Sequence, residues 1–316
     1  MKPDPSVVTV TLNPAIDQTV SIPSFAEGQV NRVTESRSYA GGKGVNVACV
    51  LADLGVGVIV TGFLGALNPE LFEKTFQSKG IEDRFVRIDG MTRTGIKIVD
   101  PSTQRTTDVN FPGLPPKHAE VAELFERITS LADPGGRWFV LSGSLPPGMP
   151  DHLYAALMPT LHRRGCRVLL DTSGGPLRKG LEGRPDVVKP NVDELAELTG
   201  SALDTPQAVR AAAETLLEKG IQRVVVSMGG EGAVFVDRGE ALLAKPPRVE
   251  VRSTVGAGDA MVAGIVSAML EDRSLEEVAR RATACGAHAV THLGAGIENQ
   301  LRYRDLIQKV EIESLA

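Results

Sequence analysis

Residues 249–270 read Val-Glu-Val-Arg-Ser-Thr-Val-Gly-Ala-Gly-Asp-Ala-Met-Val-Ala-Gly-Ile-Val-Ser-Ala-Met-Leu, and this stretch decides the fold. Apolar and charged residues alternate from Val249 to Arg252, which predicts a strand. From Ala260 onward the residues are small and apolar over about three helical turns, which predicts a buried helix. Glycines at positions 256 and 258 lie between the two segments. We therefore expect a strand that runs through a glycine turn into a helix.

The turn formed by Gly256, Ala257 and Gly258 is expected to bind an anion, because a helix start exposes unpaired N–H groups and the positive end of its dipole. Asp259 follows in the first turn, where a carboxylate often serves only to stabilise the helix. Beside an anion site, however, an ionised carboxylate repels the ligand. Its presence there therefore indicates that it has a chemical task. Accepting a proton from an attacking hydroxyl group is such a task. The stretch thus indicates phosphoryl transfer, with Asp259 activating the acceptor alcohol.

The composition is that of an ordinary globular protein with no general attraction for polyanions. The 316 residues are 42% apolar and 23% charged, with a net charge of −5. Residues 1–5 lack the apolar core of a signal peptide, and no unbroken apolar run reaches the ~18 residues of a membrane span. Cys49, Cys166 and Cys285 are far apart, as expected of core thiols in a reducing compartment. We expect a cytoplasmic protein that binds neither nucleic acid nor membrane.

Strands and helices alternate regularly from residue 116 onward. Helical patterns span 117–132, 151–164 and 206–219, and short apolar runs that predict strands lie at 138–141, 168–171 and 224–227. This alternation predicts an α/β fold with a parallel, doubly wound sheet, whose ligand-binding loops lie at the carboxyl ends of the strands. A hairpin is expected around residues 237–239.

Two other segments are expected to form a small sheet outside the main one. Residues 16–39 and 84–112 consist of short strand-like pieces with turns and show no helical period. No linker or change in composition separates them from the rest of the chain. We therefore expect residues 1–316 to form one domain, with these strands inserted as a small β-sheet.

A second glycine-rich helix start lies near residue 40. Gly41, Gly42 and Gly44 surround Lys43, and a backbone without side chains lets a ligand approach closely. Asn46 would lie in the first turn of the helix, within reach of the same ligand. A flexible loop with a surface lysine is the alternative. The motif is not a Walker A loop, since Lys43 is followed by glycine rather than by serine or threonine.

Several further side chains are expected where loops of a parallel sheet bind ligands. Asp17 follows the first predicted strand, and Arg93 begins a strand of the small sheet, where an arginine is more often simply solvated. Asn191 and Glu194 have the spacing of a helix cap, but they are also suited to hold Mg²⁺ through water. Ser227 opens the run Ser-Met-Gly-Gly-Glu-Gly, which predicts either a tight turn or a nucleotide-binding loop. No glycine cluster completes the Gly-x-Gly-x-x-Gly motif of a nicotinamide enzyme.

Three motifs resemble those of a known family. The runs Gly-Gly-Lys-Gly-x-Asn at 41–46 and Thr-Val-Gly-Ala-Gly-Asp at 254–259 resemble the two signatures of the ribokinase-like (phosphofructokinase B) carbohydrate kinases. The run Lys-Pro-Asn-x-x-Glu at 189–194 is similar to the third motif of that family. The resemblance covers nearly the whole chain, and the order and spacing of the motifs are specific.

Further runs are similar to the sugar-phosphate branch of this family. They lie at 11–17 (Thr-Leu-Asn-Pro-Ala-Ile-Asp), 92–93 (Thr-Arg), 107–111 (Thr-Asp-Val-Asn-Phe) and 142–146 (Ser-Gly-Ser-Leu-Pro). Ser253 and Thr254 resemble the 1-phosphofructokinases more than the tagatose-6-phosphate kinases, which typically carry Asn-Pro there. The resemblance implies a three-layer α/β/α fold with a small β-sheet lid, and lids of this family often pair two copies as a homodimer.

The resemblance also implies roles for individual residues. Asp259 would be the base, and Gly256, Ala257 and Gly258 would form the anion hole. The residues expected to hold the sugar phosphate are Asp17, Gly41, Gly42, Lys43, Asn46 and Arg93. Those expected to line the side of ATP and Mg²⁺ are Lys189, Asn191, Glu194, Ser227, Gly229, Gly232, Thr254, Gly256 and Gly258, with Asn191 and Glu194 holding Mg²⁺ through water.

The implied activity is transfer of the γ-phosphoryl group of ATP to the C6 hydroxyl of fructose 1-phosphate. Tagatose 6-phosphate and fructose 6-phosphate are alternative acceptors, since one phosphate clamp accepts either end of a pseudo-symmetric furanose. A non-catalytic sugar-phosphate or nucleotide sensor is a further alternative, although a binding module has no need of Asp259. Many relatives carry aspartate in place of Ser253 as part of a monovalent-cation site, so K⁺ activation is left open.

Overall fold

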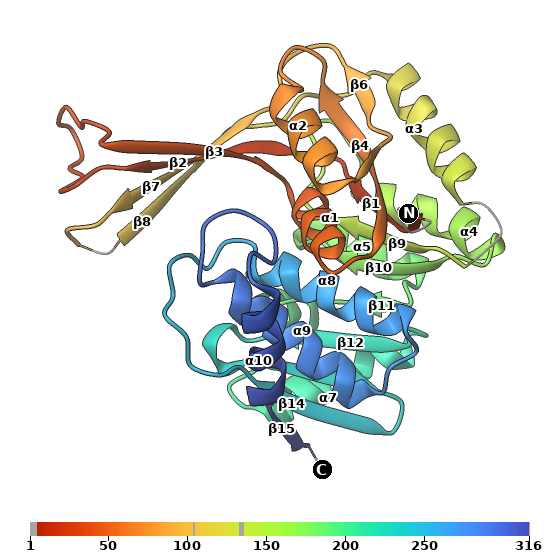
Figure 1. The fold of residues 1–316 in the computed structure, drawn as a ribbon. Helices are drawn as coiled ribbons and strands as arrows, with labels where there is room; N and C mark the ends of the chain where they lie inside the picture. The colour runs from red at the N-terminus through yellow and green to blue at the C-terminus, as the bar shows by residue number, and fades with distance from the viewer. Residues whose placement is uncertain (1–4, 104, 133–135, 316) are drawn as a thin grey trace.

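An eleven-stranded sheet runs through the middle of the molecule (Figure 1). The computed structural model describes residues 5–103, 105–132 and 136–315. From one edge to the other the strands are β15 (Glu311–Ser314), β14 (Glu240–Lys245), β13 (Ala233–Asp237), β12 (Arg223–Ser227), β11 (Val187–Val188), β10 (Arg167–Asp171), β9 (Trp138–Ser142), β1 (Pro5–Thr11), β4 (Gly57–Gly65) and β5 (Glu82–Asp83), and β6 (Val86–Ile88) pairs with the carboxyl end of β4. Strands β12 to β5 are parallel, and β13 to β15 form an antiparallel edge. The predicted parallel, doubly wound sheet is thus confirmed.

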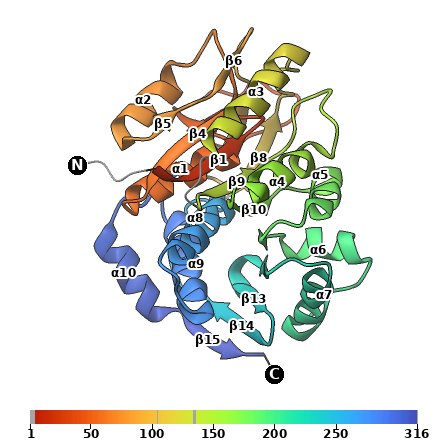
Figure 2. The same ribbon diagram turned by 90° about the vertical axis from the view of Figure 1, so that its right-hand side faces the viewer.

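Apolar residues cover both faces of the central strands. Val7, Val8 and Val10 of β1 are fully buried. Val7 belongs to one core cluster, whereas Val8 and Val10 belong to a second cluster, as the alternation of a strand requires. A parallel sheet needs this arrangement because its crossover helices cover both of its faces. The result is three layers, α/β/α, as Figure 2 shows in edge view.

The helices divide between the two faces. The first face carries α1 (Lys43–Asp53), α2 (Glu70–Lys79), α8 (Ala257–Leu270), α9 (Leu275–Ala289) and α10 (Gln300–Lys309). The second face carries α3 (His118–Leu131), α4 (Leu153–Arg163), α5 (Gly174–Gly180), α6 (Val192–Thr199) and α7 (Pro206–Glu218), with the short 3₁₀ helix η1 (Leu181–Gly183). Among the described residues, no helix combines the length and the apolar character that crossing a membrane requires.

Most predicted elements of the main body are confirmed. The helices predicted at 117–132, 151–164 and 206–219 are α3, α4 and α7, and β13 and β14 form the hairpin predicted at 237–239. Helix α5 and strand β15 were not predicted. Helix α5 has only seven residues, including three glycines and a proline, so it shows no helical period. Strand β15 lies at the sheet edge and is mostly exposed, so its sequence carries little apolar signal.

A separate four-stranded sheet, which we call the lid, projects from the body (Figure 1). Its strand order is β3 (Glu35–Gly41), β2 (Ala15–Ser21), β7 (Thr94–Asp100) and β8 (Arg105–Asn110). The expectation that the segments around 16–39 and 94–111 pair with each other is confirmed by these strands. The piece at 84–86 was also expected in the lid, and this is wrong. Val86 is fully buried in β6, which pairs with β4 of the main sheet.

The strand predicted at Val249–Arg252 is also wrong, because the chain from β14 to α8 is a loop. Strand β14 already pairs with β13 on one side and with β15 on the other, so no sheet edge is left for a further strand there. Pro246 and Pro247 precede the segment and lack the N–H groups that a sheet ladder needs. Arg252 instead donates its N–H to the Val290 carbonyl. The alternating side chains therefore belong to a loop that covers the site described below.

Candidate active site

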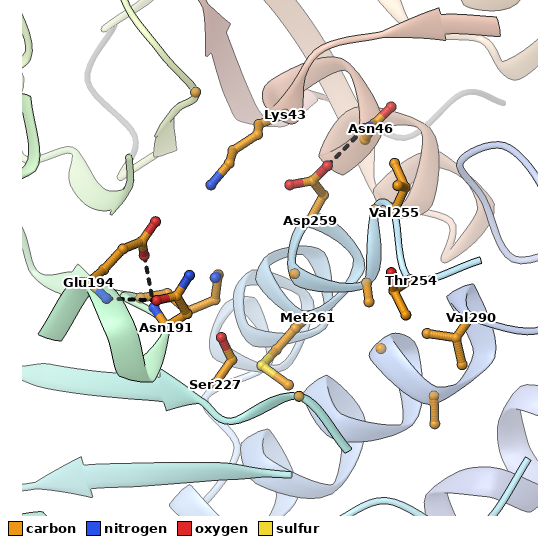
Figure 3. A pocket seen from close by; sticks show the side chains of 18 of the residues that line it. Lys43, Asn46, Asn191, Glu194, Ser227, Thr254, Val255, Asp259, Met261 and Val290 are labelled. Carbon is orange, nitrogen blue, oxygen red and sulfur yellow. Dashed lines mark hydrogen bonds between the residues drawn. The ribbon is translucent and has the colours of Figure 1, made fainter. Parts of the chain in front are cut away.

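A cavity of about 1140 Å³ lies at the carboxyl ends of the parallel strands, next to the lid. Its walls come from the starts of α1 and α8, the start of α6, and the loop between β14 and α8 (Figure 3). With the exception of Gly41, every predicted site residue lines it: Asp17, Gly42, Lys43, Asn46, Arg93, Lys189, Asn191, Glu194, Ser227, Gly229, Gly232, Thr254, Gly256, Ala257, Gly258 and Asp259. Residues from both ends of the chain are thus gathered around one space.

The start of α8 leaves backbone amides free at this cavity. The helix is capped by Gly256, whose φ of 79° is left-handed, and no side chain caps it. Within the described residues, the amides of Gly256, Gly258 and Asp259 donate to no acceptor. Lys189 Nζ lies 3.5 Å from the point where a Cβ of Gly258 would be. Free amides and a cation at one helix start fit a phosphate group.

Asp259 lies in the first turn of α8, buried between the two glycine-rich helix starts. Asn46 Nδ2 donates to Asp259 Oδ2 at 2.8 Å, which orients the carboxylate (Figure 3). Burial raises the pKa of Asp259 to about 6, and the negative charge of Asp171 adds to this effect. Lys43 acts in the opposite direction. The side chain is therefore ionised at pH 7, and it binds a proton more strongly than an ordinary aspartate does.

Asp171 is a site residue that the sequence analysis missed. It ends β10, and its fully buried carboxylate contacts Lys43 Nζ at 3.2 Å and Lys189 Nζ at 3.3 Å, both through Oδ1. Burial opposes ionisation, but the two lysines outweigh it and lower the pKa of Asp171. A signal was available, because an acidic residue directly after an apolar strand lies where loops of a parallel sheet bind ligands.

Gly41 does not line the cavity but makes room for Asp17. A side chain at Gly41 would collide with the Asp17 carboxylate on the neighbouring strand β2. Burial raises the pKa of Asp17, while Arg93 and Lys97 act against this rise. Asp17 also lines a second cavity of about 270 Å³, between the lid and residues 293–296. The two cavities therefore share Asp17, together with Asn46, Val255 and Gly256.

Arg93 is held in place at the cavity, which contradicts the alternative of a solvated surface arginine. Its Nη1 donates to the Phe111 carbonyl at 3.1 Å, and its Nη2 donates to the Asn13 carbonyl at 3.3 Å. Asn13 Nδ2 in turn donates to Ser144 Oγ at 3.2 Å. Asn13 and Ser144 also line the cavity, although the sequence analysis gave neither of them a role of its own.

Asn191 and Glu194 form the helix cap that their spacing predicts. Asn191 Oδ1 accepts from the Glu194 N–H at 2.7 Å, and Glu194 Oε2 accepts from the Asn191 N–H at 2.8 Å. Both residues also line the cavity. Burial lowers the pKa of Lys43, but the negative charges of Asp171, Asp259 and Glu194 outweigh it and raise that pKa. Their oxygen atoms are of the type that Mg²⁺ binds. A Mg²⁺ contact through water stays a prediction.

The glycine-rich run after β12 forms the far wall of the cavity. Ser227 ends β12, and the short 3₁₀ helix η2 (Gly229–Glu231) follows. Gly229 has a left-handed φ of 58° and open space around it, so a ligand has access to its backbone. A side chain at Gly232 would collide with the Ala244 carbonyl, so this glycine serves the packing of the sheet as well. Met261 and Val290 add apolar side chains to the cavity wall (Figure 3).

A model of known protein families matches residues 8–301, and its description is pfkB family carbohydrate kinase. The chain belongs to this family. The proposed resemblance to the ribokinase-like carbohydrate kinases is thereby confirmed.

Individual pfkB relatives match the chain over nearly its whole length. It is 46% identical to the 1-phosphofructokinase of Rhodobacter capsulatus over 309 residues, covering 98% of both chains. It is 38% identical to the 1-phosphofructokinase of Escherichia coli K12 over 310 residues, covering 97% of this chain and 98% of the relative.

Solved structures of pfkB relatives share the fold. Phosphofructokinase-2 from Escherichia coli, solved in complex with substrates and products, superposes with a TM-score of 0.90 at 30% identity, covering 96% of this chain and 98% of the other. A possible 1-phosphofructokinase from Thermotoga maritima gives a TM-score of 0.87 at 30% identity, with 98% and 99% coverage. The predicted three-layer ribokinase-like fold is thus confirmed.

Proposed function

We propose that the protein transfers the γ-phosphoryl group of ATP to the C6 hydroxyl of fructose 1-phosphate, giving fructose 1,6-bisphosphate and ADP. One observation carries the proposal: Asp259, with its pKa of about 6, lies buried beside the free amides of α8 and near Lys43 and Lys189. This is the combination of base, anion site and cations that phosphoryl transfer to an alcohol needs. The relatives named 1-phosphofructokinase support the choice of acceptor.

Asp259 acts as the general base. It accepts the proton of the acceptor hydroxyl, the hydroxyl oxygen bonds to the γ-phosphorus, and the bond to the β,γ-bridging oxygen breaks so that ADP leaves. Asn46 holds the carboxylate in orientation through its hydrogen bond to Oδ2. Because the base must be ionised, we expect kcat/KM to fall as the pH drops below about 6. A profile of kcat/KM against pH measures this fall, which we call the acid limb.

The amides of Gly256 and Gly258 and the lysines stabilise the charge of the moving phosphoryl group. Asn191 and Glu194 would hold Mg²⁺ through water, and Mg²⁺ supplies charge neutralisation on the phosphate oxygens. Ser227, Gly229, Gly232 and Thr254 would line the nucleotide, with the apolar wall taking the base.

The sugar phosphate would lie between α1 and the lid. Asp17 would accept hydrogen bonds from sugar hydroxyls, and Arg93 would supply a cation for the sugar's own phosphate group. Lys43 would instead face the transferred phosphoryl group, because it lies beside Asp171 and Lys189. Arg93→Ala should therefore raise KM for the sugar phosphate by on the order of 10-fold or more with a smaller change in kcat. Steady-state kinetics with the sugar varied at saturating ATP test this. An unchanged KM would remove Arg93 from the site.

We also propose that residues 1–316 form one kinase domain and that two copies join through the lid in the cytoplasm. Val109 of β8 and Val33 of the connection between β2 and β3 are exposed apolar side chains, which a partner copy would cover. K⁺ dependence stays open, since Ser253 offers a neutral hydroxyl that already accepts from the Val255 N–H. A phosphofructokinase-2 from Escherichia coli has been solved in complex with potassium.

An ADP-release assay tests the proposal directly. Fructose 1-phosphate, fructose 6-phosphate, tagatose 6-phosphate and the unphosphorylated sugars are compared at equal concentration with Mg·ATP. We expect the highest kcat/KM with fructose 1-phosphate. A higher kcat/KM with either 6-phosphate would contradict the proposed substrate. No turnover with any sugar would indicate a sensor instead of an enzyme.

A further inference from the structure

We propose that Asp171 is a positioning residue, which holds Lys43 and Lys189 together as a pair of cations at the place where the phosphoryl group passes. This inference rests on the proposed kinase function of the cavity. Asp171 itself is not required to touch the substrate. It acts through the two lysines and through its charge on Asp259.

The backbone around Asp171 is fixed by a dense set of hydrogen bonds. The Gly143 N–H donates to the Asp171 carbonyl at 2.9 Å, and the Lys189 N–H donates to the Leu170 carbonyl at 3.1 Å. The Tyr154 hydroxyl, itself fully buried, reaches the carbonyls of Ser142 and Gly143 at 3.1 and 3.0 Å. The end of β10 is therefore a rigid anchor, to which the lysines come from two other elements.

One carboxylate oxygen carries both contacts. Lys43 Nζ lies 3.2 Å and Lys189 Nζ 3.3 Å from Asp171 Oδ1, while Oδ2 has no hydrogen-bond partner within the described residues. Two ammonium groups that share one oxygen repel each other, and only the buried negative charge keeps them together. Asp171 thus sets the spacing of the two cations as well as their position.

The two lysines differ in freedom. The Lys189 side chain is only 4% exposed, whereas that of Lys43 is 37% exposed and reaches into the cavity (Figure 3). Lys189 is therefore a fixed charge close to Gly258 at the start of α8. Lys43 is the exposed member of the pair, so it is the cation that an arriving anion can contact directly while Asp171 still holds it.

The charge of Asp171 also acts on Asp259. Burial is the largest cause of the raised pKa of Asp259, and the charge of Asp171 is the second largest. Both lysines lower this pKa. Removing the Asp171 charge leaves the lysines as the main charges facing Asp259, so the pKa of Asp259 must fall. A weaker base results, which is an effect that a purely structural carboxylate would not have.

Asp237 offers a matched control. Its carboxylate pairs with Arg223 through both oxygens, at 2.7 and 2.5 Å, and both side chains are largely buried. Arg223 is the first residue of β12, at the end of the sheet opposite to the cavity, and neither residue lines it. Asp237→Asn therefore breaks a comparable ion pair without touching the site.

The first experiment is Asp171→Asn, which keeps the shape of the side chain and removes its charge. We expect kcat with fructose 1-phosphate to fall by about 10- to 100-fold and the acid limb of kcat/KM to move down by about one pH unit. Asp237→Asn should lower the unfolding temperature but leave both quantities unchanged. An Asp171→Asn variant with the wild-type kcat and acid limb overturns the proposal.

A second readout needs no substrate. The carboxyl ¹³C resonance of Asp259, assigned by its loss in Asp259→Asn, is titrated in wild type and in Asp171→Asn. A lower pKa in the variant supports the coupling, and an unchanged pKa contradicts it. If this shift is found but wild type phosphorylates none of the sugars, the proposed function fails while the charge coupling stands.

If Asp171→Asn does not fold because Lys189 is left buried without a counter-ion, the double variant Asp171→Asn/Lys189→Met removes both charges. Lys189→Met alone is the reference for it. We expect the acid limb of the double variant to lie below that of Lys189→Met. Coincident limbs in the two variants would overturn the proposal.

Discussion

Helices α8 and α9 pack against each other in the same layer, but they begin in opposite ways. Ser274 caps α9 by accepting from the Glu277 N–H, and the first-turn acids lie beside arginines, with Glu276 exposed and Glu277 half-buried. Helix α8 begins at Gly256 with free amides, and its first-turn acid, Asp259, is buried. The start of α9 favours stability at every position. The free amides and the buried acid at the start of α8 lower the stability of the fold, which is the pattern expected of a binding or catalytic site.

The largest expected effect comes from the acid of α8. Asp259→Asn should lower kcat by on the order of 10²–10⁴, because the acceptor hydroxyl loses its base. Glu277→Gln in α9 removes an acid from the same turn of the neighbouring helix and should leave kcat unchanged. Steady-state assays of both variants measure the contrast. Near-normal turnover of Asp259→Asn would remove the base from the proposed mechanism.

The same substitution should stabilise the protein. In the folded state the pKa of Asp259 is about 6, against an ordinary value of 3.8, so the fold loses stability as the pH rises from about 4 to 6, and the loss is complete above 6. The difference corresponds to about 3 kcal/mol at pH 7. Asp259→Asn should recover much of this at pH 7, and the gain over wild type should vanish below about pH 4.

Urea unfolding at pH 7 and at pH 4 measures this gain. Glu277→Gln should instead destabilise the protein by about 0.3–1 kcal/mol, since an acid in the first turn stabilises a helix start. A destabilising effect of Asp259→Asn at pH 7 would contradict the claim that the start of α8 lowers the stability of the fold.

A smaller effect is expected from the cap of α8. Gly256→Ala forces a side chain into a left-handed conformation and should cost about 1–2 kcal/mol of stability. It should also displace the amides and lower kcat by on the order of 10-fold. Gly239→Ala is a matched control, because Gly239 has a φ of 90° and open space but lies in the β13–β14 turn. It should lose stability alone, and an equal loss of kcat in Gly239→Ala would contradict the role of the cap.

The smallest effect is expected at the start of α9. Ser274→Ala removes the cap bond to the Glu277 N–H and should destabilise the protein by about 1 kcal/mol. Thermal unfolding measures this, and kcat and KM should stay at their wild-type values. A change in kcat or KM would contradict the expectation that the start of α9 contributes to stability alone.

Sequence patterns predicted the parts of the site that are local. The glycine turns before Lys43 and Asp259 mark helix starts, and the Asn191–Glu194 spacing marks a cap, because each is determined within a few residues. Periodicity likewise predicted the main helices and the strands of the hairpin. These features need no knowledge of the rest of the fold.

Features that depend on distant partners were missed. Asp171 gains its role only because Lys43 and Lys189 come from other elements to meet it. Residues 249–252 alternate like a strand, but β14 has no free edge to pair with them. Strand β6 was expected in the lid because nothing local shows that its apolar residues pack beside β4. In each case the tertiary neighbours decide the outcome.

The parallel pairing of β2 with β7 has a consequence for the order in which the molecule assembles. The chain between these two strands includes the lid strand β3 and then α1, β4, α2, β5 and β6, which form one end of the main body. Bringing the strands together across so long a segment is entropically unfavourable until that segment is itself folded. The lid should therefore form last and open first, and its amide protons should exchange with solvent while those of the main sheet are still protected.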